Sequence, residues 1–417
     1  MITVVLGILA VIGVPLFVVI AVGALWGYHE SGIDLQAIAI EIFGVAEMPI
    51  LSAIPLFTFA GYLISEGGAP GRLVRISQKL LGWMPGGLAL ISLAGCAIFT
   101  AFTGASGVTI IALGALLYPA LKEAGYPDNF NLGLITTSGS LGLLFAPSLP
   151  LILYGVVAKV SIDDLFIAGI LPGLLMLVLL GGWSLWVNRH NRQPAGSFSW
   201  AEAWPALRAA RWEIPLPFIV LGGIYSGYFA VSEAAAVTAI YVLLVELVIL
   251  REIPWSRLPA IMRESMVLVG GILLILGVSL ASTNYMIDAG IPERLFEAVD
   301  SMVSGPTSFL WLLIGFLLIL GAILDIFSAI VLVVPLLLPV AEAFDIDPIH
   351  LGIIFLSAMQ LGYLTPPVGL NLFIASYRFN QTITRIYAAT LPFLLILLFA
   401  VILITFWPAL SLALLGR

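Results

Sequence analysis

Long segments without a charged residue constrain this chain more than any other feature of its sequence. The longest extends from residue 80 to residue 121 without a single Asp, Glu, Lys or Arg. About 20 apolar residues are enough to cross the hydrocarbon core of a bilayer. Runs of sufficient length occupy 1–28, 80–121, 129–158, 165–188, 265–287, 301–324, 351–377 and 386–416. The sequence therefore predicts an all-α integral membrane protein, because helical spans satisfy their own backbone hydrogen bonds.

Composition supports this prediction and excludes several other classes. Of the 417 residues, 61% are hydrophobic and 9% are charged, whereas soluble domains carry about 25% charged residues. The net charge of -7 opposes nucleic-acid binding, and the single cysteine, Cys96, cannot form an internal disulfide. No Gly-Lys pair occurs, so the phosphate-binding motif of P-loop ATPases is absent. We expect a gradient, a partner or the substrate itself to drive the work of this protein.

Basic residues set the expected orientation. They form four clusters, which the positive-inside rule places in the cytoplasm: Arg72, Arg75 and Lys79; Arg189, Arg192, Arg208 and Arg211; Arg251, Arg257 and Arg263; Arg378 and Arg385. Further spans are expected at 35–65 and 214–250, and the run 1–28 is interpreted as a span rather than a signal peptide. With a cytoplasmic N-terminus, 83–121 and 304–341 must each return to the side from which they entered. These re-entrant hairpins would open on opposite faces.

The two hairpin regions also resemble each other in sequence. Identical residues 220 positions apart are Pro119 and Pro339, Gly142 and Gly362, Pro147 and Pro367, and Pro172 and Pro392. Opposite-facing segments with one constant offset predict an inverted-topology repeat, which supports alternating access in secondary transporters. A chance alignment of leucine-rich helices is the alternative.

Both repeats contain Gly, Pro, Ser and Thr where their helices should break, at 103–109, 136–142, 321–328 and 360–367. At membrane depth, freed carbonyl groups must line a cavity or be buried in protein. Carbonyl and hydroxyl oxygens suit a monovalent cation, and half-helix N-termini favour an anionic group. Alternatively, the small residues only permit close helix packing. The candidate binding residues are Thr103, Gly104, Ser106, Gly107, Ser138, Gly139, Ser140, Gly142, Asp325, Ser328, Gln360, Gly362, Thr365 and Pro366.

Asp325 is the most specific candidate, because it is the one acid in the otherwise uncharged segment 301–341. A carboxylate inside a membrane is costly unless it is paired or binds a cation. The alternative is a helix cap at the hairpin tip. The constant offset places Asp325 opposite Ala105, so the two tips should differ in charge.

A different class of function is suggested by residues 104–107, Gly-Ala-Ser-Gly, which match the Gly-x-Ser-Gly pattern of rhomboid intramembrane proteases. A nucleophilic Ser106 would need a base beside it. His29, His190 and His350 all lie outside the uncharged runs, so the sequence does not favour an enzyme.

Longer stretches resemble a known family. They are FTGASGVTIIALGALLYPALKEAGY, SGSLGLLFAPSLPLILYG and LFIAGILPG within 99–173, GGIYSGYFAVSEAAAVTAIY at 222–241, and LGAILDIFSAIVLVVPLLLPVAEAFDIDPIHLGII and LGYLTPPVGLNLF within 320–373. Together they resemble the large membrane subunit (DctM type) of tripartite ATP-independent periplasmic (TRAP) transporters. The resemblance covers nearly the whole chain, although Ala146 precedes Pro147 where the family often has a second proline.

The resemblance implies an elevator-type, sodium-coupled importer in the bacterial inner membrane, with no organic cofactor. A small membrane subunit (DctQ type) would support the scaffold within the membrane lipid, and a periplasmic solute-binding protein (DctP type) would deliver an organic acid. By match with the family, one sodium ion would use Ser106, Gly107, Gly139 and Ser140, and a second would use Asp325, Gly362 and Thr365.

Four parts are expected along the chain. They are scaffold helices at 1–79, a first transport repeat at 80–188, a cytoplasmic linker with scaffold or arm helices at 189–264, and a second repeat at 265–417. The alternative function is a single-component sodium–dicarboxylate symporter of the divalent-anion family, which would transport without a binding protein.

Overall fold

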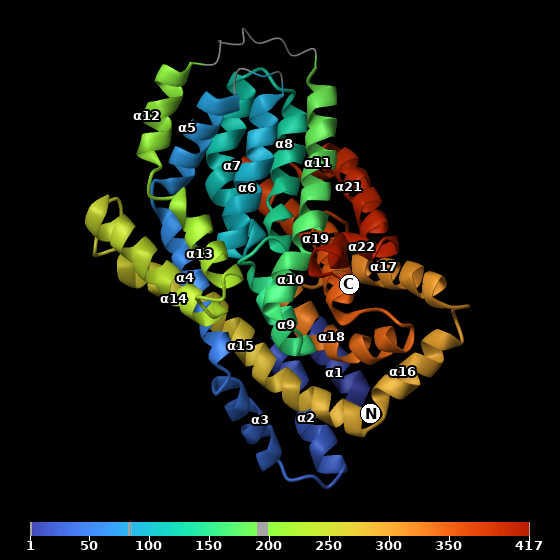
Figure 1. The fold of residues 1–417 in the computed structure, drawn as a ribbon. Coiled ribbons are helices and arrows are strands. Elements are labelled where there is room, and N and C mark those ends of the chain that lie inside the picture. The colour runs from blue at the N-terminus through green and yellow to red at the C-terminus, as the bar shows by residue number, and fades with distance from the viewer. Residues whose placement is uncertain (1, 82–83, 85, 190–198, 417) are drawn as a thin grey trace.

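The uncharged runs form helices throughout the residues that the computed structural model describes, which are 2–81, 84, 86–189 and 199–416 (Figure 1). Within these ranges the chain has no β-strand. Seven helices there are long and apolar enough to cross a membrane, or eight if the bent pair Asp128–Leu144 and Leu149–Ala158 counts as one span. The predicted all-α membrane fold is therefore confirmed.

The N-terminal region has shorter helices than predicted. Its elements are α1 (Ile2–Val11), α2 (Leu16–Glu30), α3 (Gln36–Ala46), the 3₁₀ turn η1 (Pro49–Ser52), α4 (Ala53–Glu66) and α5 (Ala69–Leu81). The run 1–28 was expected to form one span, and this prediction is wrong at Pro15. Proline has no N–H and cannot continue the hydrogen bonds of a helix. Helix α1 therefore ends at Val11, and a separate helix, α2, begins at Leu16. Pro49 likewise divides the expected span 35–65.

The first repeat contains a helical hairpin followed by a broken helix. Its elements are α6 (Gly87–Thr103), α7 (Ser106–Glu123), α8 (Asp128–Ser138), the 3₁₀ turn η2 (Leu141–Leu144), α9 (Leu149–Ala158), α10 (Ile162–Ala168) and α11 (Ile170–Val187). The expected start of the hairpin at residue 83 lies outside the described residues. A cis peptide bond joins Ala146 to Pro147 in the break between α8 and α9.

The middle of the chain connects the two repeats. Its elements are α12 (Trp200–Ala209), α13 (Pro215–Tyr225), α14 (Val231–Leu243), the π-helical turn η3 (Leu244–Ile249), α15 (Leu258–Asp288) and α16 (Ile291–Asp300). The segment 214–250, where a span was expected, forms two helices, α13 and α14, joined at 226–230. Of these, α14 with η3 is long and apolar enough to cross a membrane, whereas α13 is shorter. Arg192, in the second basic cluster, lies outside the described residues. The division of the chain into four parts stays a prediction.

The second repeat likewise contains a helical hairpin followed by a broken helix. They are α17 (Pro306–Ile323), α18 (Ile326–Ala343), α19 (Pro348–Gly362), α20 (Leu370–Phe379), α21 (Ile383–Phe406), α22 (Ala409–Leu412) and the 3₁₀ turn η4 (Ala413–Leu415). The loop between α19 and α20 contains a cis peptide bond between Pro366 and Pro367.

Helix boundaries repeat at the offset found in the sequence. Both ends of α7 and of α18 differ by 220 positions, and the pairs α6 and α17, α8 and α19, and α9 and α20 start within one residue of that offset. In Figure 1, α6 and α7 occupy the upper half of the molecule, whereas α18 lies in the lower half beside α16. The two predicted hairpins therefore reach the middle of the protein from opposite ends.

The two repeats interlock rather than pack as separate units. α20 of the second repeat packs on α7 of the first, and α9 of the first packs on α18 of the second. Tyr154 on α9 is fully buried, and its hydroxyl donates to the Pro348 carbonyl at the start of α19 over 2.7 Å. Each hairpin is thus held by a broken helix of the other repeat.

Candidate functional site

The tips of the two hairpins line one cavity of about 380 Å³. The first tip contributes Gly104, Ala105, Ser106, Gly107 and Val108; the second contributes Asp325, Ile326 and Phe327; and Tyr62, Ile111, Leu143, Leu268, Tyr363, Leu370 and Ile374 complete the lining. Two segments that are 220 positions apart thus meet at one site. Asp325 is the one charged residue in this lining.

The first tip leaves the start of α7 open. Gly104 ends α6 with φ +66°, a left-handed conformation that glycine adopts without strain. Ala105 is extended, and no side chain caps the helix that follows. The first N–H groups of a helix have no partner within it, and they carry the positive end of the helix dipole. The start of α7 can therefore accept an anionic group.

The second tip is capped by its own side chains. Asp325 Oδ1 accepts from the N–H groups of Phe327 and Ser328, each over 3.0 Å, and Asp325 Oδ2 accepts from Ser328 Oγ over 2.5 Å. The Ile326 N–H donates to Tyr363 Oη over 2.7 Å. These bonds satisfy the first turn of α18, and Asp325 is exposed. The structure thus shows the capping geometry; the role of Asp325 as a sodium ligand stays a prediction.

Hydroxyl groups are concentrated behind the first tip. Thr100 Oγ1 lies 2.7 Å from Thr109 Oγ1 and donates to the Gly139 carbonyl over 2.8 Å. Ser106 Oγ donates over 2.7 Å to Asn371 Oδ1 on α20. The Asn371 amide in turn donates to the Thr136 carbonyl over 3.3 Å. These bonds link hairpin α6–α7, the broken helix α8 and the opposite repeat.

Some buried hydroxyls near this network have no partner. Thr103 Oγ1 and Thr137 Oγ1 accept and donate no hydrogen bond, and both residues are fully buried. Ser357 Oγ, 220 positions after Thr137, is also buried without a partner. Leaving such a group unsatisfied costs about 1–3 kcal/mol. Hydroxyl oxygens are suitable ligands for a monovalent cation, so the chemistry of each of these groups fits a sodium ion.

Other predicted residues make different contacts. Ser138 and Ser140 donate to the Ile135 and Thr137 carbonyls, each over 3.3 Å. Gln360 Nε2 lies 2.7 Å from Met176 Sδ, and its Oε1 is buried without a partner. Thr365 donates to the Leu361 carbonyl, and Pro366 is exposed. The residues that do not line the cavity are Thr103, Ser138, Gly139, Ser140, Gly142, Ser328, Gln360, Gly362, Thr365 and Pro366.

Two of the predicted glycines have a packing role. A β-carbon on Gly142 would overlap the Ala97 carbonyl and the Ala101 nitrogen of α6. A β-carbon on Gly362 would lie 2.5 Å from the backbone of Gly321 on α17. In both repeats, a glycine therefore lets the broken helix approach its own hairpin closely, as the packing alternative proposed.

Comparison with known proteins identifies the family. The model of the DctM component of tripartite ATP-independent periplasmic transporters matches residues 1–410. This chain belongs to the DctM family. As a DctM protein, it is a large permease subunit of a TRAP transporter and a multi-pass protein of the inner membrane.

Individual relatives agree with this assignment. The DctM chain is 35% identical over 393 residues to a C4-dicarboxylate TRAP transporter large permease of Pseudomonas aeruginosa, covering 94% of this chain and 92% of the relative. It is 30% identical over 409 residues to an ectoine/5-hydroxyectoine TRAP transporter large permease of Ruegeria pomeroyi, covering 97% and 96%. The fold resembles that of the Alcanivorax borkumensis YdaH transporter, with a TM-score of 0.60, 13% identity and coverage of 90% and 88%.

Asn371, Thr100 and Thr109 of this DctM site were not among the candidate residues predicted from the sequence, although Thr109 lies in the predicted break at 103–109. Asn371 lies within the stretch LGYLTPPVGLNLF and is a buried amide in a helix of apolar neighbours.

The structure places no base at the hydrogen bond of Ser106, which a nucleophilic serine would need. Its hydroxyl donates to an amide oxygen, which is not a base.

Proposed function

We propose that this DctM permease takes an organic acid from a DctP-type periplasmic binding protein and moves it into the cell, driven by a sodium gradient. The convergence of both hairpin tips on one cavity is the observation that carries this proposal. The open start of α7 would bind a carboxylate of the substrate. Relatives named for C4-dicarboxylates and for ectoines support the class, because all these molecules contain a carboxylate.

Sodium would bind behind the first tip and beside the second. The unpartnered hydroxyls of Thr103 and Thr137 supply neutral oxygen ligands, with Ser106, Gly107, Gly139 and Ser140 close in sequence. Asp325, Gly362 and Thr365 would form the second site. Because the hairpins and broken helices interlock, they would move as one body against the remaining helices in an elevator motion. A DctQ-type subunit would brace those helices.

The test is uptake into proteoliposomes that contain the permease with its small subunit. Labelled C4-dicarboxylates and other organic acids are supplied with or without the binding protein, under an inward sodium gradient. We expect uptake with sodium, with binding protein and without ATP. Uptake that persists when potassium replaces sodium and a pH gradient is imposed would refute sodium coupling.

Two further results would favour one of the alternative functions over a TRAP transporter permease. Uptake by this chain alone, without a binding protein, would favour the single-component symporter. An intramembrane hydrolase would be favoured if the wild type cleaves a membrane protein, Ser106→Ala does not, and neither the wild type nor the variant takes up substrate. We expect Ser106→Ala to retain measurable uptake and the chain to have no proteolytic activity.

A further inference from the structure

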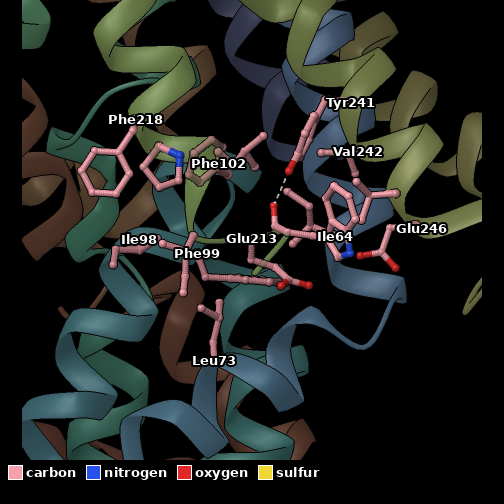
Figure 2. A pocket seen from close by; sticks show the side chains of 15 residues that line it. Ile64, Leu73, Ile98, Phe99, Phe102, Glu213, Phe218, Tyr241, Val242 and Glu246 are labelled. Atoms are coloured by element: carbon pink, nitrogen blue, oxygen red, sulfur yellow. Dashed lines mark hydrogen bonds between the residues drawn. The ribbon is translucent and has the colours of Figure 1, made fainter. Parts of the chain in front are cut away.

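A second cavity, of about 340 Å³, lies between hairpin helix α6 and the helices of the middle region (Figure 2). Its walls are mostly apolar and include Ile98 and Phe99 from α6 and Phe218 from α13. Figure 2 shows Glu213 and Glu246 on one side of the cavity, with Phe218 and Ile98 on the opposite side. The cavity is therefore amphipathic, with an acidic end and an apolar end.

Carboxylates outnumber bases at the acidic end. Arg72 Nε donates to Glu213 Oε1 over 2.6 Å, and the same guanidinium pairs with Glu252. Glu246 Oε1 is 3.6 Å from Arg72 Nη2, beyond hydrogen-bond distance. Gly68 N–H donates to Glu252 over 2.7 Å. The guanidinium of Arg72 thus lies within ion-pair distance of three carboxyl groups, and its contact with Glu246 is the longest.

Polar atoms are left unsatisfied at this end of the cavity. Glu246 is only 2% exposed, and its Oε2 has no hydrogen-bond partner. Glu213 Oε2 and the indole Nε1 of Trp212 are also buried without partners, and both residues line the cavity. Leaving a buried polar group without a partner is costly. Two carboxyl oxygens and one indole N–H of residues that line the cavity are thus left without hydrogen-bond partners.

The apolar end opens to the surface of this chain. Phe218 is 74% exposed and Ile98 is 47% exposed, so an acyl chain could reach both. Glu246 lies three positions before the end of the span Val231–Ile249, which is about 5 Å of helix. The acidic end is thus close to the level of lipid headgroups. Arg211, exposed, has its guanidinium carbon 5.4 Å from the centre of the Trp212 ring.

We propose that this cavity binds an aminophospholipid of the phosphatidylethanolamine class. Its primary ammonium would donate to the free oxygens of Glu213 and Glu246. Its phosphate would accept from the Trp212 indole beside Arg211, and an acyl chain would follow Phe218 and Ile98. A quaternary ammonium has no N–H to donate, and an anionic glycerol headgroup has no positive charge. The proposal does not depend on the identity of the transported substrate or the coupling ion.

The test measures lipid retention by native mass spectrometry of the purified permease with its small subunit. Delipidated protein is incubated with equal amounts of phosphatidylethanolamine, phosphatidylcholine and phosphatidylglycerol that have the same acyl chains. We expect one retained phosphatidylethanolamine, preferred about tenfold over phosphatidylcholine, because only the primary ammonium has N–H groups to donate to the carboxyl oxygens. A tenfold preference corresponds to about 1.4 kcal/mol. Glu246→Gln should abolish this preference, and Glu213→Gln should reduce it.

Two controls separate the headgroup from the tail and from general charge. Glu297→Gln changes an exposed acid on α16 and should leave the preference unchanged. Phe218→Ala should weaken retention of all three lipids without changing their ratio. Size-exclusion profiles would show that each variant is folded, and Glu213→Gln serves as the second test if Glu246→Gln is not.

Several outcomes would overturn the proposal. Equal retention of phosphatidylethanolamine and phosphatidylcholine would show an acyl-chain groove only. Preference for phosphatidylglycerol, or an unchanged preference in both folded Glu→Gln variants, would exclude the acidic end as the ammonium site. Binding of decylamine by protein that retains none of the three phospholipids would assign the cavity to free amines instead of a lipid.

Discussion

Ser106 and Asn371 are 265 positions apart, yet Ser106 Oγ donates a 2.7 Å hydrogen bond to Asn371 Oδ1. The bond joins the tip of the first hairpin to the broken helix of the second repeat. Asn371 is fully buried and also donates to the Thr136 carbonyl. One amide thus connects three helices beside the cavity between the hairpin tips.

We expect Asn371→Leu to destabilise the permease by about 1–3 kcal/mol, because the Ser106 hydroxyl and the Thr136 carbonyl lose a buried partner. Sodium-dependent uptake should fall as well, since the first tip would lose its anchor. The measurement is the thermal unfolding midpoint, followed by uptake at matched protein levels. Asn284→Leu on the exposed face of α15 is the control. An unchanged midpoint in Asn371→Leu would contradict this role.

The side chain of Asp325 caps helix α18 and carries a negative charge, and two variants can test these contributions separately. Asn caps helices about as well as Asp, so Asp325→Asn should keep the hydrogen bonds to Phe327 and Ser328 while removing the charge. Since Asp325 is exposed, a cation about 4 Å away would lose about 1 kcal/mol, or about fivefold in affinity.

Asp325→Ala also removes the helix cap. It should therefore lower the free energy of unfolding by about 1 kcal/mol, and with it the thermal unfolding midpoint. The measurements are the sodium half-saturation of uptake and thermal unfolding of both variants. If Asp325→Asn leaves sodium dependence unchanged, Asp325 is a cap alone.

Thr137 offers a test of the first sodium site that does not damage the fold. Its hydroxyl has no partner in the structure, so Thr137→Val should not lower stability in sodium-free buffer. If Thr137 Oγ1 binds sodium, the variant should lose most of the stabilisation that sodium confers. Thr136→Val is the matched control, because its hydroxyl donates to the Leu132 carbonyl over 2.7 Å within its own helix. Equal sodium-induced shifts in both variants would exclude Thr137.

Glu252 predicts a pH dependence of stability. Burial favours a raised pKa for this carboxyl group, but hydrogen bonds from Arg72 and from the Gly68 N–H outweigh burial and lower its pKa. A lowered folded-state pKa means that the contribution to stability is present above the unfolded-state pKa and is lost as the pH falls through the folded-state value.

Glu252→Gln should therefore lower the unfolding midpoint at pH 7 and reduce its decrease between pH 7 and pH 3. The measurement is thermal unfolding of the wild type and the variant across this range. Glu293→Gln, which changes an exposed acid on α16, should follow the wild type. A parallel decrease in Glu252→Gln would show that other groups cause the acid sensitivity.

Local sequence was sufficient for the two hairpins and their relationship. Hydrophobic length and the absence of charge act on each segment by itself, so runs such as 80–121 predicted helices before any packing was known. The offset of 220 positions predicted which helices would match, and α7 and α18 match at both ends. Gly104 marked the first tip, because glycine readily adopts the positive φ that this turn requires.

Tertiary structure alone decided which side chains meet. The bond between Ser106 and Asn371 and the three carboxylates around Arg72 join segments with no recognisable pattern between them. The exposed, capping position of Asp325 likewise follows from how its hairpin tip opens into the cavity. Charge and hydropathy determine whether a segment enters the membrane; the packing of helices distant in sequence determines which polar atoms become partners and which remain available to a ligand.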